Sequence, residues 1–175
     1  MVKYVLTGAD GNLGGFAADY IAEVKSDNDE VVFTSYKFDG GEESDWEARG
    51  IKAKNVIQAA KETGVKRVCY TSFVGADSDK PIDEVPFLPR DHHFIEHEVY
   101  ASGLDYNIQR NWLYQNNTPQ FFAQSWHFTG LVNSHDVPGA YVAREECGRV
   151  FGALLLGKQE KKTVVDVTGS EPVLD

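Results

Sequence analysis

The chain has 175 residues, which suits a single domain. Its 17 Lys and Arg against 27 Asp and Glu give a formal net charge of −10. An acidic chain of this kind lacks the clustered cations that nucleic acid or an anionic membrane surface requires. We therefore expect neither nucleic acid nor a membrane as a partner. Hydrophobic residues make up 42% of the chain, which is enough for a packed core and excludes a disordered chain.

The two cysteines, Cys69 and Cys147, are far apart and lack the spacing of a metal site. This favours a reducing compartment over a disulfide scaffold. The longest apolar runs, such as 150–156, are much shorter than the roughly 20 residues of a membrane helix. The chain opens with a predicted strand rather than a signal peptide. Together these features predict a cytoplasmic protein.

Segments with the pattern of strands alternate along the chain with segments that have the spacing of helices. The predicted strands are residues 1–7, 31–35, 66–72, 106–110, 141–143 and 163–167. The predicted helices are residues 16–24, 53–63, 92–101 and 145–156. The predicted connections are an acidic loop over 27–47 around the short strand, a loop over 75–89 and an irregular aromatic segment over 111–138. The alternation predicts an α/β fold whose mostly parallel sheet is covered by helices on both faces.

A glycine-rich turn joins the first strand to the first helix. Gly8 permits a sharp turn, Gly11 has no Cβ and lets a pyrophosphate approach the backbone, and Gly14 lets the helix pack closely on the strand. The phosphates would meet N–H groups at the positive end of the helix dipole. We assign to cofactor binding the residues Gly8, Asp10, Gly11, Asn12, Leu13 and Gly14. The alternative is a plain strand-to-helix turn without a ligand.

Four stretches of the chain resemble one family. They are 5–15 (VLTGADGNLGG), 55–75 (NVIQAAKETGVKRVCYTSFVG), 101–117 (ASGLDYNIQRNWLYQNN) and 141–157 (YVAREECGRVFGALLLG). They resemble the NmrA-like atypical short-chain dehydrogenase/reductase family, and within it the NAD(P)H:quinone oxidoreductase branch. The resemblance implies a Rossmann fold. It also implies that the ligand is NADPH rather than NADH, since NADPH is the more usual ligand of the family. It also implies either hydride transfer to a quinone or related carbonyl compound, or non-catalytic redox sensing.

The chain lacks two parts that the family has. About forty residues, with two strand–helix units, are missing after the first helix, and so is the C-terminal lobe. We therefore expect one Rossmann-like domain over 1–175, shortened at one edge of its sheet. If the first strand becomes an edge of the sheet, the chain must connect it directly to the strand on its remaining side. That connection conflicts with the right-handed crossover rule. If 31–35 instead acts as the second strand, Ser35 and Lys37 could meet a 2′-phosphate, while Asp39 would favour a free ribose.

The resemblance also implies which residues line the nicotinamide side of the site: Thr34, Ser35, Thr71, Ser72 and His92. Thr71 and Ser72 end a predicted parallel strand at the carboxyl edge, where open α/β sheets bind ligands. His92 matches a histidine at a helix start in the quinone-reductase branch. Ser72 and His92 are therefore the candidate catalytic residues. The alternatives are a strand-end hydroxyl bonded within the fold and a surface histidine.

The proton donor of the better-known relatives, a Tyr-x-x-x-Lys pair, is missing from this sequence, and His97 stands where a Lys often lies. A quinone needs an aromatic, apolar slot with one or two hydrogen-bond donors, because the cofactor supplies the hydride and the protein aligns the two rings. The candidate substrate-binding residues are Phe73, Asn111, Trp112 and Tyr114. The alternative for each of them is ordinary packing. The expected partners are a small quinone-like molecule and a second copy of the chain in a homodimer.

His93, Glu96 and His97 match the pattern H-x-x-E-H of a class of zinc peptidases. On a helix the two histidines would share a face, as metal ligation requires. The sequence offers no convincing third ligand, so we expect no metal.

Two other hypotheses compete with the hypothesis that the protein is an enzyme. One is a non-catalytic dinucleotide sensor, and the other is an incomplete domain that binds nothing well. The sequence leaves all three hypotheses open.

Overall fold

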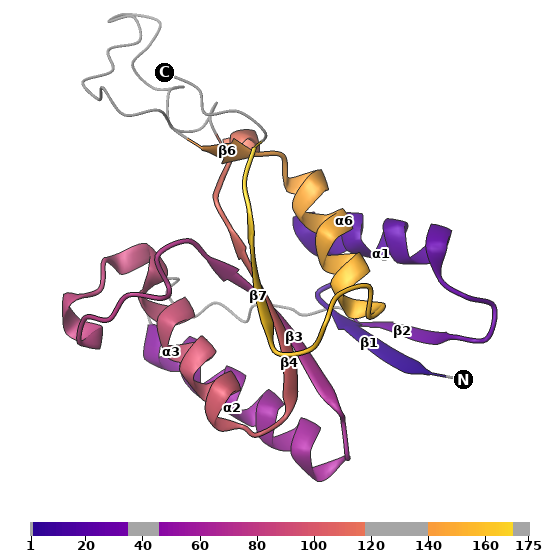
Figure 1. The fold of residues 1–175 in the computed structure, drawn as a ribbon, viewed down its shortest axis with the longest axis horizontal. Helices are drawn as coiled ribbons and strands as arrows, with labels where there is room; N and C mark the ends of the chain where they lie inside the picture. Colours follow the sequence, from indigo (N-terminus) through magenta and orange to yellow (C-terminus); the bar gives the residue numbers. More distant parts are fainter. Residues whose placement is uncertain (1, 35–45, 118–139, 170–175) are drawn as a thin grey trace, which may run out of the picture.

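The computed structural model describes residues 2–34, 46–117 and 140–169. The elements in chain order are β1 (Lys3–Thr7), α1 (Asn12–Val24), β2 (Glu30–Thr34), α2 (Trp46–Glu62), β3 (Arg67–Phe73), η1 (Ile82–Glu84), α3 (Phe87–Ala101), β4 (Asp105–Asn111), β5 (Leu113–Tyr114), η2 (Gln115–Asn117), β6 (Tyr141–Val142), α6 (Arg144–Leu155) and β7 (Thr163–Val167). Helices α1 and α6 lie on one side of the strands, and α2 and α3 lie on the other (Figure 1). The predicted covering of both faces is therefore confirmed.

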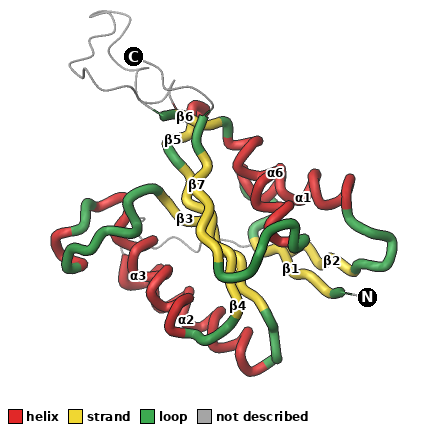
Figure 2. The backbone as a smooth tube through the Cα atoms, viewed as in Figure 1, coloured by secondary structure: helices red, strands yellow, loops and turns green. Residues whose placement is uncertain are grey.

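All paired strands in the described part of the chain run parallel, as predicted. Three sheets have the orders β1-β2, β3-β4-β7 and β5-β6. Figure 2 shows the β1–β2 pair lying beside the longer β3–β4–β7 sheet. The described residues thus form neighbouring short sheets rather than one continuous ladder.

The pairing of β2 decides between the two interpretations of segment 31–35. β2 pairs with β1 in parallel, with Lys3 opposite Glu30 and Thr7 opposite Thr34. This segment therefore acts as the second strand, and α1 is the crossover between the pair. The conflict with the crossover rule does not arise, because β1 does not connect directly to β3. Residues 35–45, which include Ser35, Lys37 and Asp39, lie outside the described part of the chain.

A shared core joins the β1–β2 pair to the rest of the molecule. Leu6 of β1 packs with Ala17 and Ile21 of α1 and with Phe151 of α6, and Cys69 of β3 packs against this cluster. A second core lies on the other face, where Ile57 of α2, Ile95 and Val99 of α3, and Ile108 of β4 are buried together. Each face therefore has one helix pair and one apolar cluster.

Helices α1 and α6 approach closely because α6 carries glycine at the contact. A Cβ at Gly148 would overlap the Phe16 side chain and would lie 3.0 Å from both the Ala17 nitrogen and the Leu13 oxygen. At Gly152 a Cβ would lie 2.8 Å from the Tyr20 ring. The backbone atoms beside Gly148 cannot move aside as a flexible side chain can, and a Cβ at Gly152 would also lie 3.2 Å from the Ala17 oxygen, so both positions favour glycine.

Three helices begin four or more residues earlier than the sequence predicts, and the first of them is α1, which begins at Asn12 rather than 16. α2 begins at Trp46 rather than 53 and runs through Gly50, where a Cβ would lie 2.5 Å from the Phe94 ring of α3. α3 begins at Phe87 rather than 92, with Pro86 as its N-cap residue. Pro89 lies in the first turn of α3, where a helix needs no N–H from it. None of the helices in the described ranges is both long and apolar enough to span a membrane.

We expect Gly148→Ala to destabilise the protein by about 1–3 kcal/mol, because the added methyl group overpacks the α1–α6 contact. Gly15→Ala is the matched control, since a Cβ at this helical glycine would lie 3.7 Å from the Ala9 oxygen, which is an ordinary contact. The control should be neutral or more stable by up to about 1 kcal/mol. Urea denaturation measures both, and equal stability of the two variants would contradict this packing.

Candidate cofactor and substrate site

The turn between β1 and α1 has the geometry of a phosphate-binding turn. Gly8 has φ of +72°, which favours glycine. Gly11 donates its N–H to the Gly8 oxygen at 2.9 Å and is the N-cap residue of α1, without a side-chain cap in the described structure. A Cβ at Gly14 would overlap the Gly8 carbonyl group, so the helix begins in direct contact with the end of β1. Backbone amides of the first turn, from Asn12 on, are thus available for an anion.

Neighbouring segments hold this turn in place. Ala9 donates its N–H to the Thr34 oxygen at 3.1 Å, which ties the turn to the carboxyl end of β2. Leu13 packs against the Leu6 core and also against a third cluster formed by Val142, Cys147 and Val167. The first turn of α1 therefore lies between β1 and the elements β6, α6 and β7. Asp10 is exposed at the tip of the turn.

The Ser72 hydroxyl is engaged inside the fold. Ser72 is buried at the end of β3 and donates its hydroxyl to Glu96 Oε1 of α3 at 2.5 Å. Thr71, which precedes it, is half-buried and pairs in register with Gln109 of β4. The structure therefore places both residues at the carboxyl end of β3, but it directs the Ser72 side chain toward α3.

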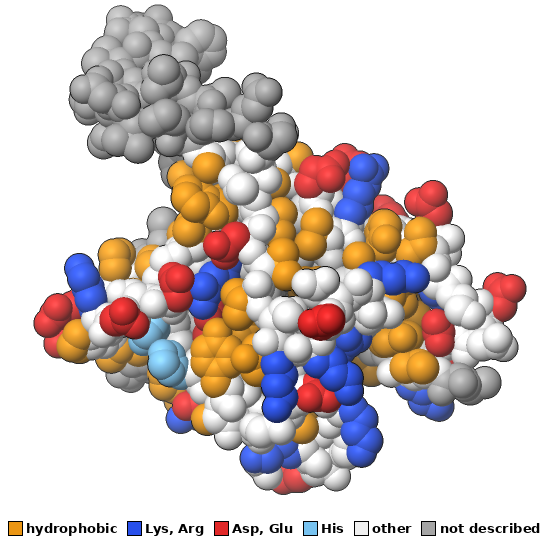
Figure 3. All heavy atoms as spheres, viewed as in Figure 1, with side chains coloured by type: hydrophobic (Ala, Val, Ile, Leu, Met, Phe, Trp, Pro, Cys, Tyr) orange, Lys and Arg blue, Asp and Glu red, His pale blue; other side chains and the backbone are white. Residues whose placement is uncertain are grey.

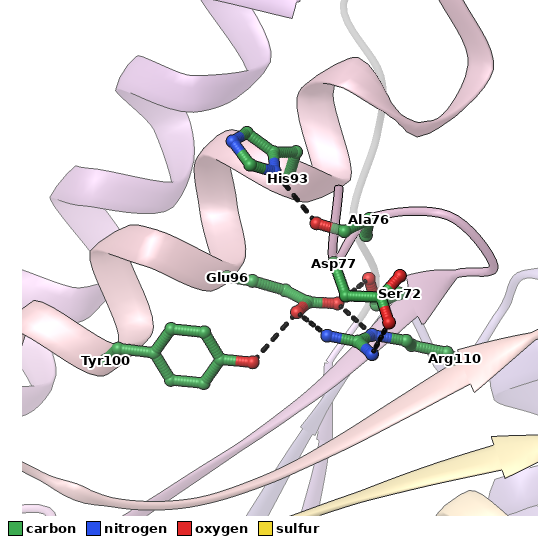
Figure 4. Close-up of polar contacts among 7 residues, drawn as sticks. All are labelled: Ser72, Ala76, Asp77, His93, Glu96, Tyr100 and Arg110. Carbon is green, nitrogen blue, oxygen red and sulfur yellow. Dashed lines mark hydrogen bonds and ion pairs between the residues drawn. The ribbon is translucent and has the colours of Figure 1, made fainter. Parts of the chain in front are cut away.

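An ion cluster around the buried Glu96 fixes the ends of β3 and β4 to α3. Its members are Ser72, Asp77, Glu96, Tyr100 and Arg110, of which Asp77 and Tyr100 are exposed. Arg110 donates to Glu96 from Nε at 3.0 Å and from Nη2 at 2.7 Å, and its Nη1 lies 3.0 Å from Asp77. The Tyr100 hydroxyl donates to Glu96 Oε2 at 2.9 Å. Figure 4 shows the Glu96 carboxylate between these donors. Glu96 is 1% exposed, so this pairing is what makes a buried carboxylate tolerable.

The ion cluster sets the charge of its members. Burial raises the pKa of Glu96, but hydrogen bonds from Arg110, Ser72 and Tyr100 outweigh burial and leave the pKa below its ordinary value. The hydrogen bond to Glu96 raises the pKa of Arg110. Both groups are therefore charged at neutral pH. Sequence reasoning did not find this cluster, although a charged Arg110 inside a predicted buried strand was a usable signal.

His92 lies beside the end of β3 and is held by two neighbours. Its Nδ1 lies 2.8 Å from the Tyr70 hydroxyl, and its ring stacks on Phe73 with the ring centroids 6.2 Å apart. Burial lowers the pKa of His92, and Asp91, which pairs with Arg49 at 2.6 Å, opposes that effect only in part. His92 is therefore neutral at neutral pH. Burial also raises the pKa of Tyr70, so the Tyr70 hydroxyl keeps its proton and forms a neutral hydrogen bond with His92 Nδ1.

The candidate substrate residues form two groups. Phe73 lies against His92, whereas Trp112 and Tyr114 pack against the Val142, Cys147 and Val167 cluster. Asn111 is opposite Phe73 in the β3–β4 register and donates its amide N–H to the Tyr114 hydroxyl at 3.0 Å. Burial raises the pKa of Tyr114, so this hydroxyl keeps its proton and can donate it to another acceptor.

The cysteines have no nucleophilic role. Both are free thiols, and burial raises the pKa of each to about 11. Since the thiolate is the reactive form, neither is a nucleophile at neutral pH.

Comparison with known proteins places this geometry in a family. A profile described as NAD(P)H-binding matches residues 8–155. The chain belongs to this NAD(P)H-binding family. An NmrA-like family domain-containing oxidoreductase from Aspergillus flavus is 23% identical over 215 residues, which cover 98% of this chain and 67% of that protein. The predicted resemblance to NmrA-like oxidoreductases is confirmed. The aligned length exceeds the 175 residues of this chain, so the relative contains segments that this chain lacks.

Solved structures of reductases share the fold of this member of the NAD(P)H-binding family. Triphenylmethane reductase from Citrobacter sp., complexed with NADP(H), has a TM-score of 0.74 at 18% identity and matches 98% of this chain and 70% of its own. An NADPH-dependent quinone oxidoreductase from Escherichia coli, complexed with NADPH, has a TM-score of 0.69 at 20% identity with the same coverage of 98% and 70%. The predicted Rossmann-like fold, shortened relative to these proteins, is confirmed.

We expect Glu96→Gln to destabilise the protein by about 3–5 kcal/mol, because it removes the buried charged partner of Arg110 and leaves only the exposed Asp77. Glu98→Gln on the same helix is the control. Glu98 pairs with Lys54 at 3.3 Å on the surface, and such pairs contribute about 1 kcal/mol or less. Guanidinium denaturation measures the free energy of unfolding of both variants. Similar, small losses of stability in the two would contradict the proposed importance of the ion cluster.

The same variant tests the protonation of Glu96. The pKa of Glu96 is lowered in the folded protein, so its stabilising effect is complete above the unfolded pKa of about 4.3 and is lost as the pH falls through the lower folded value. The difference in unfolding free energy between wild type and Glu96→Gln should be constant above about pH 5 and should shrink below about pH 4. A difference that grows on acidification would contradict this charge state.

Proposed function

We propose that this protein is an NADPH-dependent reductase that transfers a hydride to a quinone or a related carbonyl compound. The observation that carries the proposal is the close contact between Gly14 and the Gly8 carbonyl, which leaves the first-turn amides of α1 available. Bound to these amides, a pyrophosphate would lie at the same end of the parallel strands as Thr71, Ser72 and His92. The family match supports the dinucleotide, and the two reductases of similar fold support the reaction class.

The proposed cofactor contacts follow the chain from β1 to α3. Gly8, Asp10, Gly11, Asn12, Leu13 and Gly14 would surround the pyrophosphate. Thr34 and Ser35 would meet the cofactor from the end of β2. Thr71, Ser72 and His92 would meet the nicotinamide end, with His92 as a neutral imidazole and Ser72 contributing through the backbone that Glu96 fixes. NADPH is the preferred form in this proposal because both reductases of similar fold were solved with NADP(H) or NADPH.

The substrate would lie beside Phe73, Asn111, Trp112 and Tyr114. When bound, NADPH supplies the hydride. Phe73 and Trp112 would provide apolar contact with the quinone ring, and the protonated Tyr114 hydroxyl, which accepts a hydrogen bond from Asn111, would donate to the carbonyl oxygen. Such a donor stabilises the negative charge that develops on that oxygen. The hydride and one proton together convert the quinone to the hydroquinone, and the cofactor leaves as NADP⁺.

One structural observation favours a second function, a non-catalytic NAD(P)H sensor. The Ser72 hydroxyl is engaged with Glu96, and His92 is held by Tyr70 and stacked on Phe73. Neither side chain is therefore positioned as a strong acid or base. NADPH binding without oxidation of NADPH by simple quinones would favour the sensor over the reductase.

We expect Gly14→Ala to abolish NADPH binding, because its Cβ would overlap the Gly8 carbonyl and displace the helix start. The matched control is Gly15→Ala, whose Cβ has ordinary room and which should bind NADPH as wild type does. Fluorescence titration with NADPH and NADH measures both variants and the cofactor preference.

Unchanged binding by Gly14→Ala would contradict the assignment of the turn. Thermal melting distinguishes an incomplete domain, since NADPH at 100 times its Kd should stabilise a binding-competent fold by about 2.7 kcal/mol. A melting temperature that does not respond to NADPH would favour the hypothesis of an incomplete domain.

We expect Tyr114→Phe to lower kcat/KM for a simple quinone by about tenfold or more, since a hydrogen bond to a developing charge is lost. The Kd for NADPH should be unchanged, because Tyr114 belongs to the substrate group. Tyr20→Phe in α1 is the control, as Tyr20 packs near Gly152 and away from Asn111. Equal kcat/KM for wild type and Tyr114→Phe would contradict the proposed donor.

A further inference from the structure

The histidines of the H-x-x-E-H segment lie together on one face of α3. His93 and His97 are one helical turn apart, and their ring centroids are 4.5 Å apart with an interplanar angle of 59°. Histidine side chains reach the molecular surface in the space-filling view (Figure 3). The shared face that the spacing predicts is therefore present in the structure. Neither imidazole belongs to the proposed cofactor or substrate site.

Glu96, between the two histidines in sequence, points elsewhere. Figure 4 shows the Glu96 carboxylate directed at Arg110 and Ser72, while the His93 ring lies toward Ala76. Both Glu96 oxygens accept hydrogen bonds within the ion cluster. Glu96 is therefore not a general base for a metal-bound water, and the resemblance to a zinc peptidase is limited to the sequence pattern.

The His93 ring is prepared for metal ligation. Its Nδ1 lies 2.8 Å from the Ala76 oxygen, and since a carbonyl oxygen only accepts, Nδ1 carries the proton. The lone pair of His93 consequently resides on Nε2. Metal-ligating histidines commonly donate their other ring N–H to a carbonyl group in this way, which fixes the tautomer and the orientation of the ring.

The space next to these imidazoles can hold an ion with its water ligands. A cavity of about 410 Å³ is lined by His93, His97, Asp77 and Asp79, together with other residues of the 76–80 loop, α3 and β4. Asp77 pairs with Arg110. In the ranges that the structure describes, no group of three or more His, Cys, Asp or Glu side chains is placed to hold a metal ion. A site here would therefore have two protein ligands, with water in the remaining positions.

We propose that His93 and His97 bind one divalent transition-metal ion through two imidazole nitrogens. Imidazole suits copper, nickel and zinc, and the general order of affinity places Cu²⁺ above Ni²⁺ and Zn²⁺. Two nitrogen ligands on a rigid helix, with open positions for water, suit Cu²⁺ or Ni²⁺. They suit structural Zn²⁺ less well, because such zinc sites are closed by four protein ligands. This proposal does not depend on NADPH or on the proposed reductase activity.

Titration of the full chain, without an added histidine tag, with CuCl₂, NiCl₂ and ZnCl₂ tests the site by calorimetry. We expect one Cu²⁺ per chain, bound more tightly than the other two ions, with the electron paramagnetic resonance signature of nitrogen ligands. His97→Ala should weaken Cu²⁺ binding by at least about tenfold and remove that signature. His97 is exposed, so this variant should fold. His93→Ala should have the same effect on Cu²⁺.

Two of the three remaining histidines provide the control. The double variant His127→Ala/His135→Ala retains His93 and His97 and should bind Cu²⁺ as wild type does. The proposal is overturned if His97→Ala binds Cu²⁺ with unchanged affinity and spectrum, if the double variant loses the binding, or if the wild-type chain binds none of the three ions.

Discussion

The contact between the start of α1 and the end of β1 is the constraint on which the rest of the structure depends. The Gly14 backbone lies against the Gly8 carbonyl with no room for a Cβ, so α1 begins directly at the strand end. This fixes where the first-turn amides lie. It also brings Leu13 between two apolar clusters and aligns α1 with α6, where Gly148 and Gly152 allow an equally close contact. A larger residue at Gly14, Gly148 or Gly152 would separate the elements that form the proposed cofactor side of the molecule.

The two faces of the molecule hold different parts of the site. The α1–α6 face is apolar at its contact and holds the glycine turn, whereas the α2–α3 face contains buried charge. There, Glu96 and Arg110 tie α3 to the ends of β3 and β4, and a hydrogen bond to Tyr70 holds the His92 ring. Because buried charged pairs tolerate little displacement, these contacts hold the strand ends at which the nicotinamide and the substrate are proposed to bind. Rigid positioning is what a reaction carried by a cofactor asks of its protein.

The shortening of the sheet at one edge is compatible with the contact between β1 and α1. β2 retains its place beside β1, so the unit that positions the phosphate turn is complete. The gap in the hydrogen-bond ladder falls between β1 and β3, where Leu6 and Cys69 still meet in one core. Side-chain packing therefore replaces backbone pairing at the point where the family's central strands would adjoin.

Local sequence patterns predicted the strand, the glycine turn and the helix that follows, because each depends on neighbouring residues only. The same holds for the shared face of His93 and His97. The longer-range features were not accessible in this way. Glu96 and Arg110 are fourteen positions apart and meet only because α3 packs on β4. The hydrogen bonds of His92 and His93 likewise depend on Tyr70 and Ala76, which lie outside α3. The early starts of α2 and α3 were missed because glycine and proline there read as loop signals, although Gly50 makes room for Phe94 and Pro89 fits a first turn.

The central claim is that the first-turn amides of α1 bind the pyrophosphate of NADPH. The most direct measurement is a residue-resolved ¹⁵N–¹H correlation spectrum of the full chain with and without NADPH. The account predicts the largest shifts at Gly11, Asn12 and Leu13, with smaller shifts at Thr71 and Ser72. Saturating NADPH that leaves the amides of Gly11 to Leu13 unshifted would contradict it.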